Sequence, residues 1–315
     1  MSSPVTLYVG QALARYGFPE GHPFGIDRQG AFWQEVLRQG LDKRVNVSEP
    51  RAASRNELLR FHTADHVDWV KSQSDVGHGY LDYGDTPVFP GVFEAAATVT
   101  GTALEALERI MAGEARRSFQ AIGGMHHARR HSAAGFCVFN DLGLVIDTLR
   151  ARFGVRRVAY VDIDVHHGDG VFYSYEDDPD LILADIHEDG RYLYPGTGHA
   201  YETGRAEAKG TKLNLPLEPG AGNREFFAVW EVVVEHLRRF KPEFLVFQCG
   251  ADSLAGDPLA HLMLTPVAHT HAARSLCDLA DELCGGRLMA FGGGGYDLNN
   301  LAAGWCAVLG EMAKE

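Results

Sequence analysis

The chain has 315 residues, 45% of them hydrophobic, a length that suits one large α/β domain. Its net charge of −13 argues against a nucleic-acid-binding surface, which needs clustered basic residues. Its five cysteines are odd in number and include no CxxC pair, which indicates a reducing compartment. The N-terminus does not resemble a signal peptide and no apolar run reaches about 18 residues, so we predict a cytoplasmic protein without membrane contact.

Apolar runs typical of strands alternate along the chain with segments of helical pattern. The strands are predicted at 5–10, 118–124, 157–165, 180–187, 243–250 and 287–295, and helices at 93–111, 140–154, 224–240 and 269–286. This alternation indicates βαβ units and a mostly parallel sheet with helices on both faces. We therefore predict a single three-layer α/β domain over residues 1–315.

Polar motifs follow four of the predicted strands. They are GGMHH at 123–127, DIDVHHGD at 162–169, CGAD at 249–252 and GGGGY at 292–296. In open parallel sheets the ligand crevice lies outside the carboxyl ends of the strands. The four motifs are therefore expected to meet at one edge of the sheet and to form a functional site.

The stretch YVDIDVHHGDG, residues 160–170, concentrates acids and imidazoles at the end of a buried strand. With a strand period of two, Asp162, Asp164 and His166 point one way, whereas His167 points the other way and is expected to be structural. A buried salt-bridge cluster is the alternative, but the stretch contains no Lys or Arg to neutralise its acids. Carboxylate plus imidazole suits Zn²⁺, and also Fe²⁺ or Mn²⁺.

A catalytic zinc needs three protein ligands, and the segment QCGADSLAGDP offers two candidates for the third. Asp252 directly follows an apolar strand and is favoured. Asp257 is the competitor, but an aspartate before proline more often makes a local hydrogen bond in a turn.

Tandem histidines and a glycine-rich tyrosine motif complete the candidate chemistry. His126 or His127 can act as the general base beside a metal, with Asp162 and Asp169 as the acids that orient the two rings. Four glycines precede Tyr296, whose phenol can donate a hydrogen bond to an oxyanion. In other glycine-rich loops, Phe136 and Tyr194 are candidates for the walls of a channel.

Taken together, these motifs resemble the histone deacetylase superfamily on the arginase–deacetylase fold, and within it the bacterial acetoin-utilisation deacetylases. The similarity rests on YGFPEGHPF, GGMHHARRHSAAGFCVFND, YVDIDVHHGDGV, HEDGRYLYPGTG, QCGADSLAGDPL and FGGGGYD, and it runs from residue 16 to residue 297. The resemblance implies a sheet of about eight strands. It also implies a hydrolase that acts on linear amide C–N bonds.

The resemblance implies a role for each matching residue. Asp164, His166 and Asp252 would bind Zn²⁺, with Fe²⁺ as the alternative metal. His127, oriented by Asp169, would take the proton from the attacking water. His127, or His126 paired with Asp162, would protonate the leaving amine. Tyr296 would stabilise the oxyanion. The acyl-lysine channel would be lined by Gly135, Phe136, Tyr194 and Leu259, with Asp85 at its rim to grip the substrate backbone.

The resemblance further implies a structural K⁺. Its ligands would come from Asp162, Asp164, His166, Asp185 and Ile186. A second K⁺ would lie near Tyr175, Asp178 and Leu181. Two departures stand out, because Asp185 occupies a position where many relatives have serine and Tyr194 one where phenylalanine is usual.

The leading hypothesis is a zinc-dependent amidohydrolase that removes acetyl or related acyl groups from lysine side chains of proteins or peptides. An acetylpolyamine or another small N-acetylated amine is the alternative substrate. A ureohydrolase on the same fold needs a second closely spaced aspartate, which the segment after Asp252 lacks. A catalytically silent acyl-lysine-binding module is disfavoured because every catalytic position is filled. The sequence carries no sign of an oligomeric state.

Overall fold

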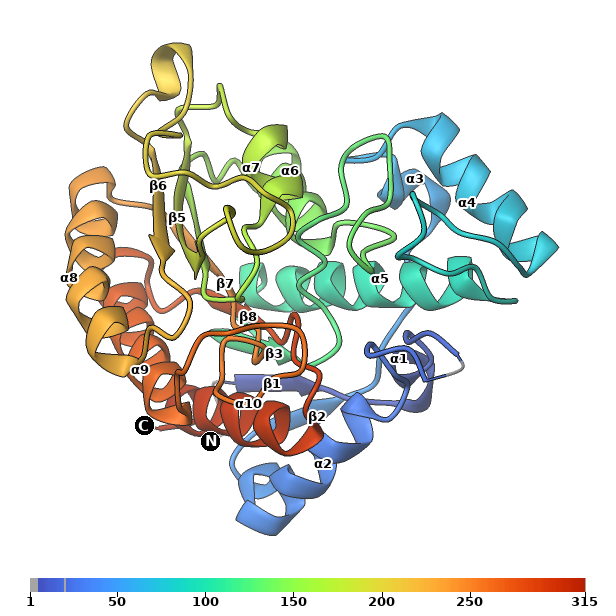
Figure 1. The fold of residues 1–315 in the computed structure, drawn as a ribbon, viewed down its shortest axis with the longest axis horizontal. Coiled ribbons are helices and arrows are strands. Elements are labelled where there is room, and N and C mark those ends of the chain that lie inside the picture. The colour runs from blue at the N-terminus through green and yellow to red at the C-terminus, as the bar shows by residue number, and fades with distance from the viewer. Residues whose placement is uncertain (1–4, 20, 315) are drawn as a thin grey trace.

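The computed structural model describes residues 5–19 and 21–314, and its strands form one parallel sheet (Figure 1). The order of the strands across the sheet is β2-β1-β3-β8-β7-β4-β5-β6. Their bounds are β1 Val5–Tyr8, β2 Asn46–Ser48, β3 Arg117–Gln120, β4 Val158–Asp162, β5 Leu181–Glu188, β6 Lys212–Leu217, β7 Phe244–Gln248 and β8 Leu288–Phe291. The predicted α/β domain with a parallel sheet is confirmed.

Helices connect the strands and cover both faces of the sheet (Figure 1). They are α1 Gln11–Ala14, α2 Arg28–Gln39, α3 Arg55–Leu58, α4 Ala64–Val76, α5 Val92–Met111, α6 Asp141–Phe153, α7 Asp169–Ser174, α8 Asn223–Phe240, α9 Pro266–Leu283 and α10 Leu298–Met312. Short 3-10 helices occupy Leu41–Lys43 and Ala206–Ala208. Within the described residues, no helix combines the length and apolar character needed to cross a bilayer.

The two faces of the sheet carry separate apolar cores because side chains alternate along each strand. In β4, Ala159 and Val161 belong to the core under α2, α8, α9 and α10, whereas Val158 and Tyr160 belong to the core under α5, α6 and α7. Strands buried on both faces have no solvent-facing side, which explains why they read as continuous apolar runs.

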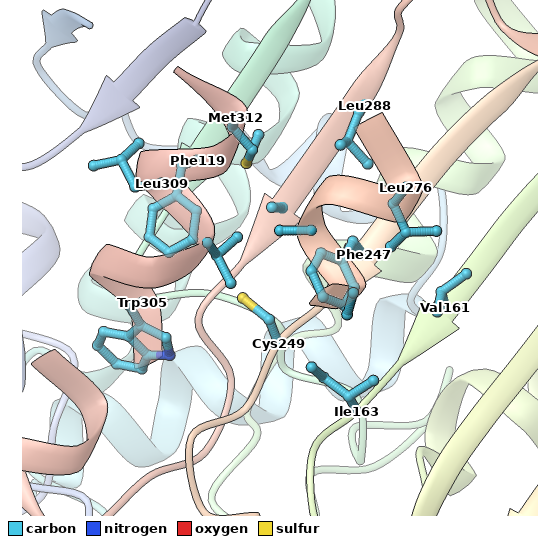
Figure 2. Packing of buried hydrophobic residues seen from close by; sticks show 14 of the residues in the cluster. Phe119, Val161, Ile163, Phe247, Cys249, Leu276, Leu288, Trp305, Leu309 and Met312 are labelled. Atoms are coloured by element: carbon cyan, nitrogen blue, oxygen red, sulfur yellow. The ribbon is translucent and has the colours of Figure 1, made fainter. Parts of the chain in front are cut away.

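Figure 2 shows part of the first core, where Trp305 and Leu309 of α10 lie near Phe119, with Phe247 and Leu276 farther along the same cluster. All five side chains are fully buried, and burial of each stabilises the fold by about 1.5–3 kcal/mol. The indole of Trp305 also donates a 2.9 Å hydrogen bond to the carbonyl of Gly292. Helix α10 therefore anchors the start of the glycine run that follows β8.

Two strands and several strand ends differ from the expectation. The short edge strand β2 and the polar start of β6 give weak apolar signals, so neither was among the predicted strands. Strand β4 ends at Asp162 instead of residue 165, because the next backbone N–H groups bind carboxylates. The N–H of Asp164 donates to Asp162, that of Val165 to Asp252 and that of His166 to Asp164.

The four strands that precede the polar motifs are neighbours in the order β3-β8-β7-β4. Because these strands are parallel, their carboxyl ends lie along one edge of the sheet. Topology thus brings together four segments that are separated by up to about 170 residues in the sequence.

Candidate metal centre and active site

Three ligand atoms converge at this edge of the sheet. One atom each from Asp164, His166 and Asp252 lies within 4.8 Å of the other two, and all three residues are buried. Nδ1 of His166 is 3.1 Å from Oδ1 of Asp164 and 3.3 Å from Oδ2 of Asp252. The three residues that were predicted as ligands therefore form a cluster that could hold one metal ion.

The electrostatics of this cluster favour a bound cation. Burial and the adjacent Asp164 raise the pKa of Asp252 to about 7. Oδ2 of Asp252 is buried without a hydrogen-bond partner among the described residues. Within the described residues, no lysine or arginine forms an ion pair with Asp164 or Asp252. A buried carboxylate oxygen without a hydrogen bond is costly, and a divalent cation held by two carboxylates and an imidazole would remove that cost.

Neighbouring groups fix the orientation of the two carboxylates. Gln248 Nε2 and the backbone N–H of Gly294 each donate a 2.8 Å hydrogen bond to Oδ2 of Asp164. The N–H of Val165 donates to Oδ1 of Asp252 at 3.0 Å. Gly294 has to be glycine, because a Cβ there would lie 1.9 Å from Oδ2 of Asp252. Such supporting contacts orient metal ligands and raise metal affinity.

The tandem histidines lie beside the cluster, and each ring contacts a different aspartate. Nδ1 of His126 is 2.8 Å from Oδ2 of Asp162, and Nδ1 of His127 is 2.7 Å from Oδ1 of Asp169. The two Nε2 atoms face each other at 3.1 Å. Asp169 also accepts a hydrogen bond from Arg129. The structure therefore brings together both predicted histidine–aspartate pairs.

The environments of the two histidines push their pKa values apart. Burial opposes the charged form of His126, yet Asp164 and Asp162 together raise its pKa to about 9. Burial and the neighbouring His126 lower the pKa of His127 to about 4. At neutral pH the pair thus offers one proton donor and one neutral imidazole. Two titratable groups with separated pKa values are typical of acid–base catalysis.

A cavity of about 200 Å³ leads from the surface to these side chains. His127 and His166, both buried, and the half-buried Tyr296 line it. Burial and Asp252 raise the pKa of Tyr296 well above its usual value of 10, so its phenol stays protonated. All the residues predicted for the channel line this cavity, namely Asp85, Gly135, Phe136, Tyr194 and Leu259.

A larger hollow of about 1040 Å³ lies behind one wall of this channel. Phe18 and His22 line it, and their rings also pack against Phe136, with centroids 6.3 Å and 4.6 Å away. Neither the metal cluster nor the tandem histidines line this hollow. The chemistry therefore belongs to the smaller cavity.

The residues predicted for the first K⁺ lie at the ends of adjacent strands, where Asp162 of β4 pairs in register with Asp185 of β5. The carboxylate of Asp185 already has two partners. Its Oδ1 is 2.6 Å from Nδ1 of His187, and its Oδ2 accepts a 2.8 Å hydrogen bond from the N–H of Gly168. Against the effect of burial, Asp185 raises the pKa of His187. A K⁺ here would share Asp185 with His187.

A second K⁺ was expected near Tyr175, Asp178 and Leu181, where the structure places an ammonium group. Lys212 reaches this position, and its ammonium donates hydrogen bonds to the carbonyls of Asp178 at 2.8 Å and Leu181 at 2.7 Å. A third bond goes to the hydroxyl of Thr211 at 2.9 Å. The side chain of Lys212 supplies the positive charge that a separate cation would have brought.

Asp257 and His167 lie outside the metal cluster and make other contacts. Asp257, the competitor for the third ligand, lies outside the cluster, and its carboxylate accepts hydrogen bonds from the N–H groups of Leu259 and Tyr296. His167 points away, with Nδ1 2.9 Å from the hydroxyl of Thr197 and its ring packed on Phe172.

Several supporting residues were not predicted from the sequence. The carboxylate of Asp141 accepts hydrogen bonds from the N–H groups of Gly124 and Met125, directly before the tandem histidines. The guanidinium of Arg28 is buried against the glycine run. Gln248 had a usable signal, because it is the one polar residue that ends the apolar run FLVF.

Several known proteins resemble this chain in sequence or in structure. The histone deacetylase domain family matches residues 22–312. The acetoin utilization protein AcuC of Bacillus subtilis is 36% identical over 94% of this chain and 79% of its own length. The histone deacetylase clr6 of Schizosaccharomyces pombe is 31% identical over 99% of this chain and 77% of its own length.

A similar solved structure is the crystal structure of the HDA15 HD domain. It superposes with a TM-score of 0.91 at 28% identity, and the match covers 99% of this chain and 88% of that domain. The fold, the sequence relatives and the matched domain all identify the same group of proteins. The chain belongs to the histone deacetylase family.

Proposed function

We propose that the protein is a zinc-dependent amidohydrolase that removes acetyl or related acyl groups from lysine side chains of proteins or peptides. The observation that carries the proposal is the buried cluster of Asp164, His166 and Asp252, whose His166 also lines the channel. The neutral His127 and the protonated Tyr296 line the same channel.

A zinc ion held by the cluster would lower the pKa of water and polarise the substrate carbonyl. His127 would accept the proton of the attacking water, because its ring is neutral and its contact with Asp169 leaves Nε2 facing the site. The charged His126, paired with Asp162, would help to protonate the leaving amine. Tyr296 would donate a hydrogen bond to the oxygen on which negative charge develops.

The channel would hold the four methylenes of the lysine side chain between aromatic walls. Phe136 and Tyr194 line it from two different loops, and Asp85 lies at its rim. The exposed carboxylate of Asp85 would accept hydrogen bonds from the substrate backbone. The same carboxylate could pair with an ammonium, which favours an acetylpolyamine or another small acetylated amine as the second candidate substrate.

We also propose zinc over Fe²⁺ as the resident metal, and a structural K⁺ at the Asp162–Asp185 position. A cytoplasmic location is supported by the five cysteines, which are all buried and unpaired.

The test is an assay of protein with a defined metal content. About one zinc per chain is expected, with turnover of an acetyl-lysine peptide above that of acetylputrescine. The Asp252→Ala variant should lose both zinc and activity. Full activity and full zinc content in this variant would sink the site assignment. Bound zinc without turnover of any acylated amine would indicate a binding module instead of an enzyme.

A further inference from the structure

The peptide bond that precedes Tyr296 is held at both of its ends. Its carbonyl, that of Gly295, accepts a 2.9 Å hydrogen bond from Nε of Arg28. Its N–H, that of Tyr296, donates a 2.8 Å hydrogen bond to Oδ2 of Asp257. Gly295 has a φ of 123°, a conformation that is open to glycine, which by itself would leave this peptide free to rotate. The two contacts therefore fix a peptide plane that the sequence leaves loose.

Tyr296 depends on such a constraint because no hydrogen bond within the described residues holds its hydroxyl. In the part of the chain that the structure describes, the phenol oxygen has no hydrogen-bond partner, and the ring makes edge contacts with Phe136 and Phe24. The direction of the phenol thus depends on these loose ring contacts and on the backbone from which the side chain leaves. A rotation of the preceding peptide would swing the hydroxyl away from the metal cluster.

Asp257 also links three parts of the site within one short segment. Its second oxygen accepts a 2.9 Å hydrogen bond from the N–H of Leu259, a residue of the channel wall. Asp252, five residues earlier in the same connection, belongs to the metal cluster. Asp257 is 6% exposed, so water competes little for its two hydrogen bonds. One segment thereby sets the positions of the cluster, the channel wall and the phenol relative to one another.

We propose that Asp257 is a positioning residue that acts through Tyr296, by fixing the Gly295–Tyr296 peptide so that the phenol points at the carbonyl of the bound amide. This inference rests on the proposed function, in which Tyr296 stabilises the oxyanion. The competing explanation is that Asp257 only closes the turn to Leu259. A double-mutant cycle separates the two, because a residue that acts only through the phenol has no further effect once the phenol is absent.

The experiment measures kcat, KM and zinc content for Asp257→Ala in the wild-type and Tyr296→Phe backgrounds. In the wild-type background we expect kcat to fall by about 10–100-fold, the size of effect that a displacement near 1 Å produces, with KM changed by less than about threefold and zinc retained. In the Tyr296→Phe background the further loss should be under about threefold. Asp257→Asn keeps the volume and one acceptor, so it can replace Asp257→Ala if that variant folds poorly. Its kcat should fall less than the kcat expected for Asp257→Ala.

The matched control is Asp297→Ala on the other side of Tyr296. Asp297 caps α10 through hydrogen bonds from the N–H groups of Asn299 and Asn300, so its loss should lower stability and leave kcat nearly unchanged. An equal loss of kcat in both tyrosine backgrounds, or the same loss in Asp297→Ala, would overturn the inference.

A second readout does not need turnover. A lysine-derived hydroxamate chelates zinc, and its carbonyl oxygen accepts a hydrogen bond from a phenol. Its affinity should fall in Asp257→Ala and should not fall further when the same change is made in Tyr296→Phe. If the wild type turns over no acetylated amine, the proposed function fails, and this affinity cycle still decides the role of Asp257. An equal fall in both backgrounds would reject that role.

Discussion

Tyr296 is the residue whose role is most directly testable, because removal of its hydroxyl leaves the ring contacts in place. The ring packs against Phe136 and Phe24, so Tyr296→Phe should fold normally and bind substrate. Loss of an oxyanion donor typically lowers kcat by about 10²–10³-fold. We expect a fall of this size with little change in KM, measured by steady-state kinetics on an acetyl-lysine peptide. A kcat within about threefold of the wild type would exclude this role for the phenol.

Gly294 is a second residue with a sharp expectation, since its missing side chain makes room for Asp252. A Cβ at this position would lie 1.9 Å from Oδ2 of Asp252 and 2.9 Å from Oδ2 of Asp164. Gly294→Ala should therefore displace a ligand and weaken zinc binding by about 10–100-fold, as loss of supporting contacts does elsewhere. Competition with a zinc indicator dye measures this change.

The matched control for Gly294 is Gly30→Ala in α2, where an added Cβ meets nothing within 4 Å. In a helix this change should stabilise the fold by about 0.5–1 kcal/mol and leave zinc affinity unaltered. Equal zinc affinities for the two variants would contradict the steric argument.

The sequence predicted the metal cluster because its signal is local. Asp164 and His166 stand two residues apart in a stretch without a basic residue, so an external cation was the simplest neutraliser. The partner of Asp257 could not be predicted, because it depends on the contact of two segments 39 residues apart in sequence. The contact of Arg28 with Gly295 could not be predicted for the same reason, since 267 positions separate the two residues.

At the scale of elements, Lys212 at the start of β6 joins that strand to the turn before β5. The residue is 1% exposed, and the hydrogen bonds of its ammonium to the described residues go to neutral oxygens, those of Asp178, Leu181 and Thr211. Burial lowers its pKa to about 8, so the group is still mostly protonated at pH 7. Lys212→Met would leave two main-chain carbonyls without this donor. We expect the free energy of unfolding to fall by about 2–4 kcal/mol in urea denaturation.

Removal of the Lys212 side chain should leave a gap the size of a cation, so that the stability of the variant depends on the cation of the salt. Carbonyl and hydroxyl oxygens bind K⁺ in place of its hydration shell, so Lys212→Ala should be stabilised more by KCl than by LiCl at equal ionic strength. The wild type should show a smaller difference between the salts. Lys209→Met, at an exposed position nearby, serves as the control and should behave like the wild type. No K⁺ preference in Lys212→Ala beyond that of the wild type would contradict a cation role for the ammonium.

Strand order shows which features of an element can be predicted. The apolar runs of β4, β7 and β8 were predicted because each strand is buried on both faces. Edge strands were missed, since β2 has three residues and β6 carries Lys212, Asn214 and Pro216 among its apolar residues. The end of β4 was placed too late, because side-chain carboxylates replace the strand ladder as partners of its backbone. The pattern of apolar residues in the sequence does not show that carboxylates compete with a neighbouring strand for backbone N–H groups.

At the scale of the whole molecule, the site is the point where the connections after four strands meet. Asp164 and His166 follow β4, Asp252 follows β7, Gly294 follows β8, and His127 follows β3. Any ion in the cluster would therefore tie together segments from across the chain. Without it, two buried carboxylates face each other through His166. Function and stability thus make opposite demands on the same side chains in the metal-free protein.

This opposition leads to a crossed prediction for thermal stability at pH 8, where the pKa of Asp252 near 7 leaves its carboxylate mostly ionised. Chelation of zinc should lower the Tm of the wild type by several degrees, because zinc at 1,000 times its Kd contributes about 4 kcal/mol. Asp252→Asn removes one buried negative charge and keeps an acceptor for the N–H of Val165. Without metal, this variant should be more stable than the wild type, whereas with zinc it should be less stable.

Scanning calorimetry on the four samples, with zinc or with chelator, measures this crossing. Asp68→Asn, which affects only an exposed ion pair with Arg55, should shift both forms equally and controls for a general effect of charge. If Asp252→Asn is less stable than the wild type in both states, the carboxylate of Asp252 contributes to the fold without a metal. The repulsion between Asp164 and Asp252 would then not be what a cation relieves, and zinc would have to be held for catalysis alone.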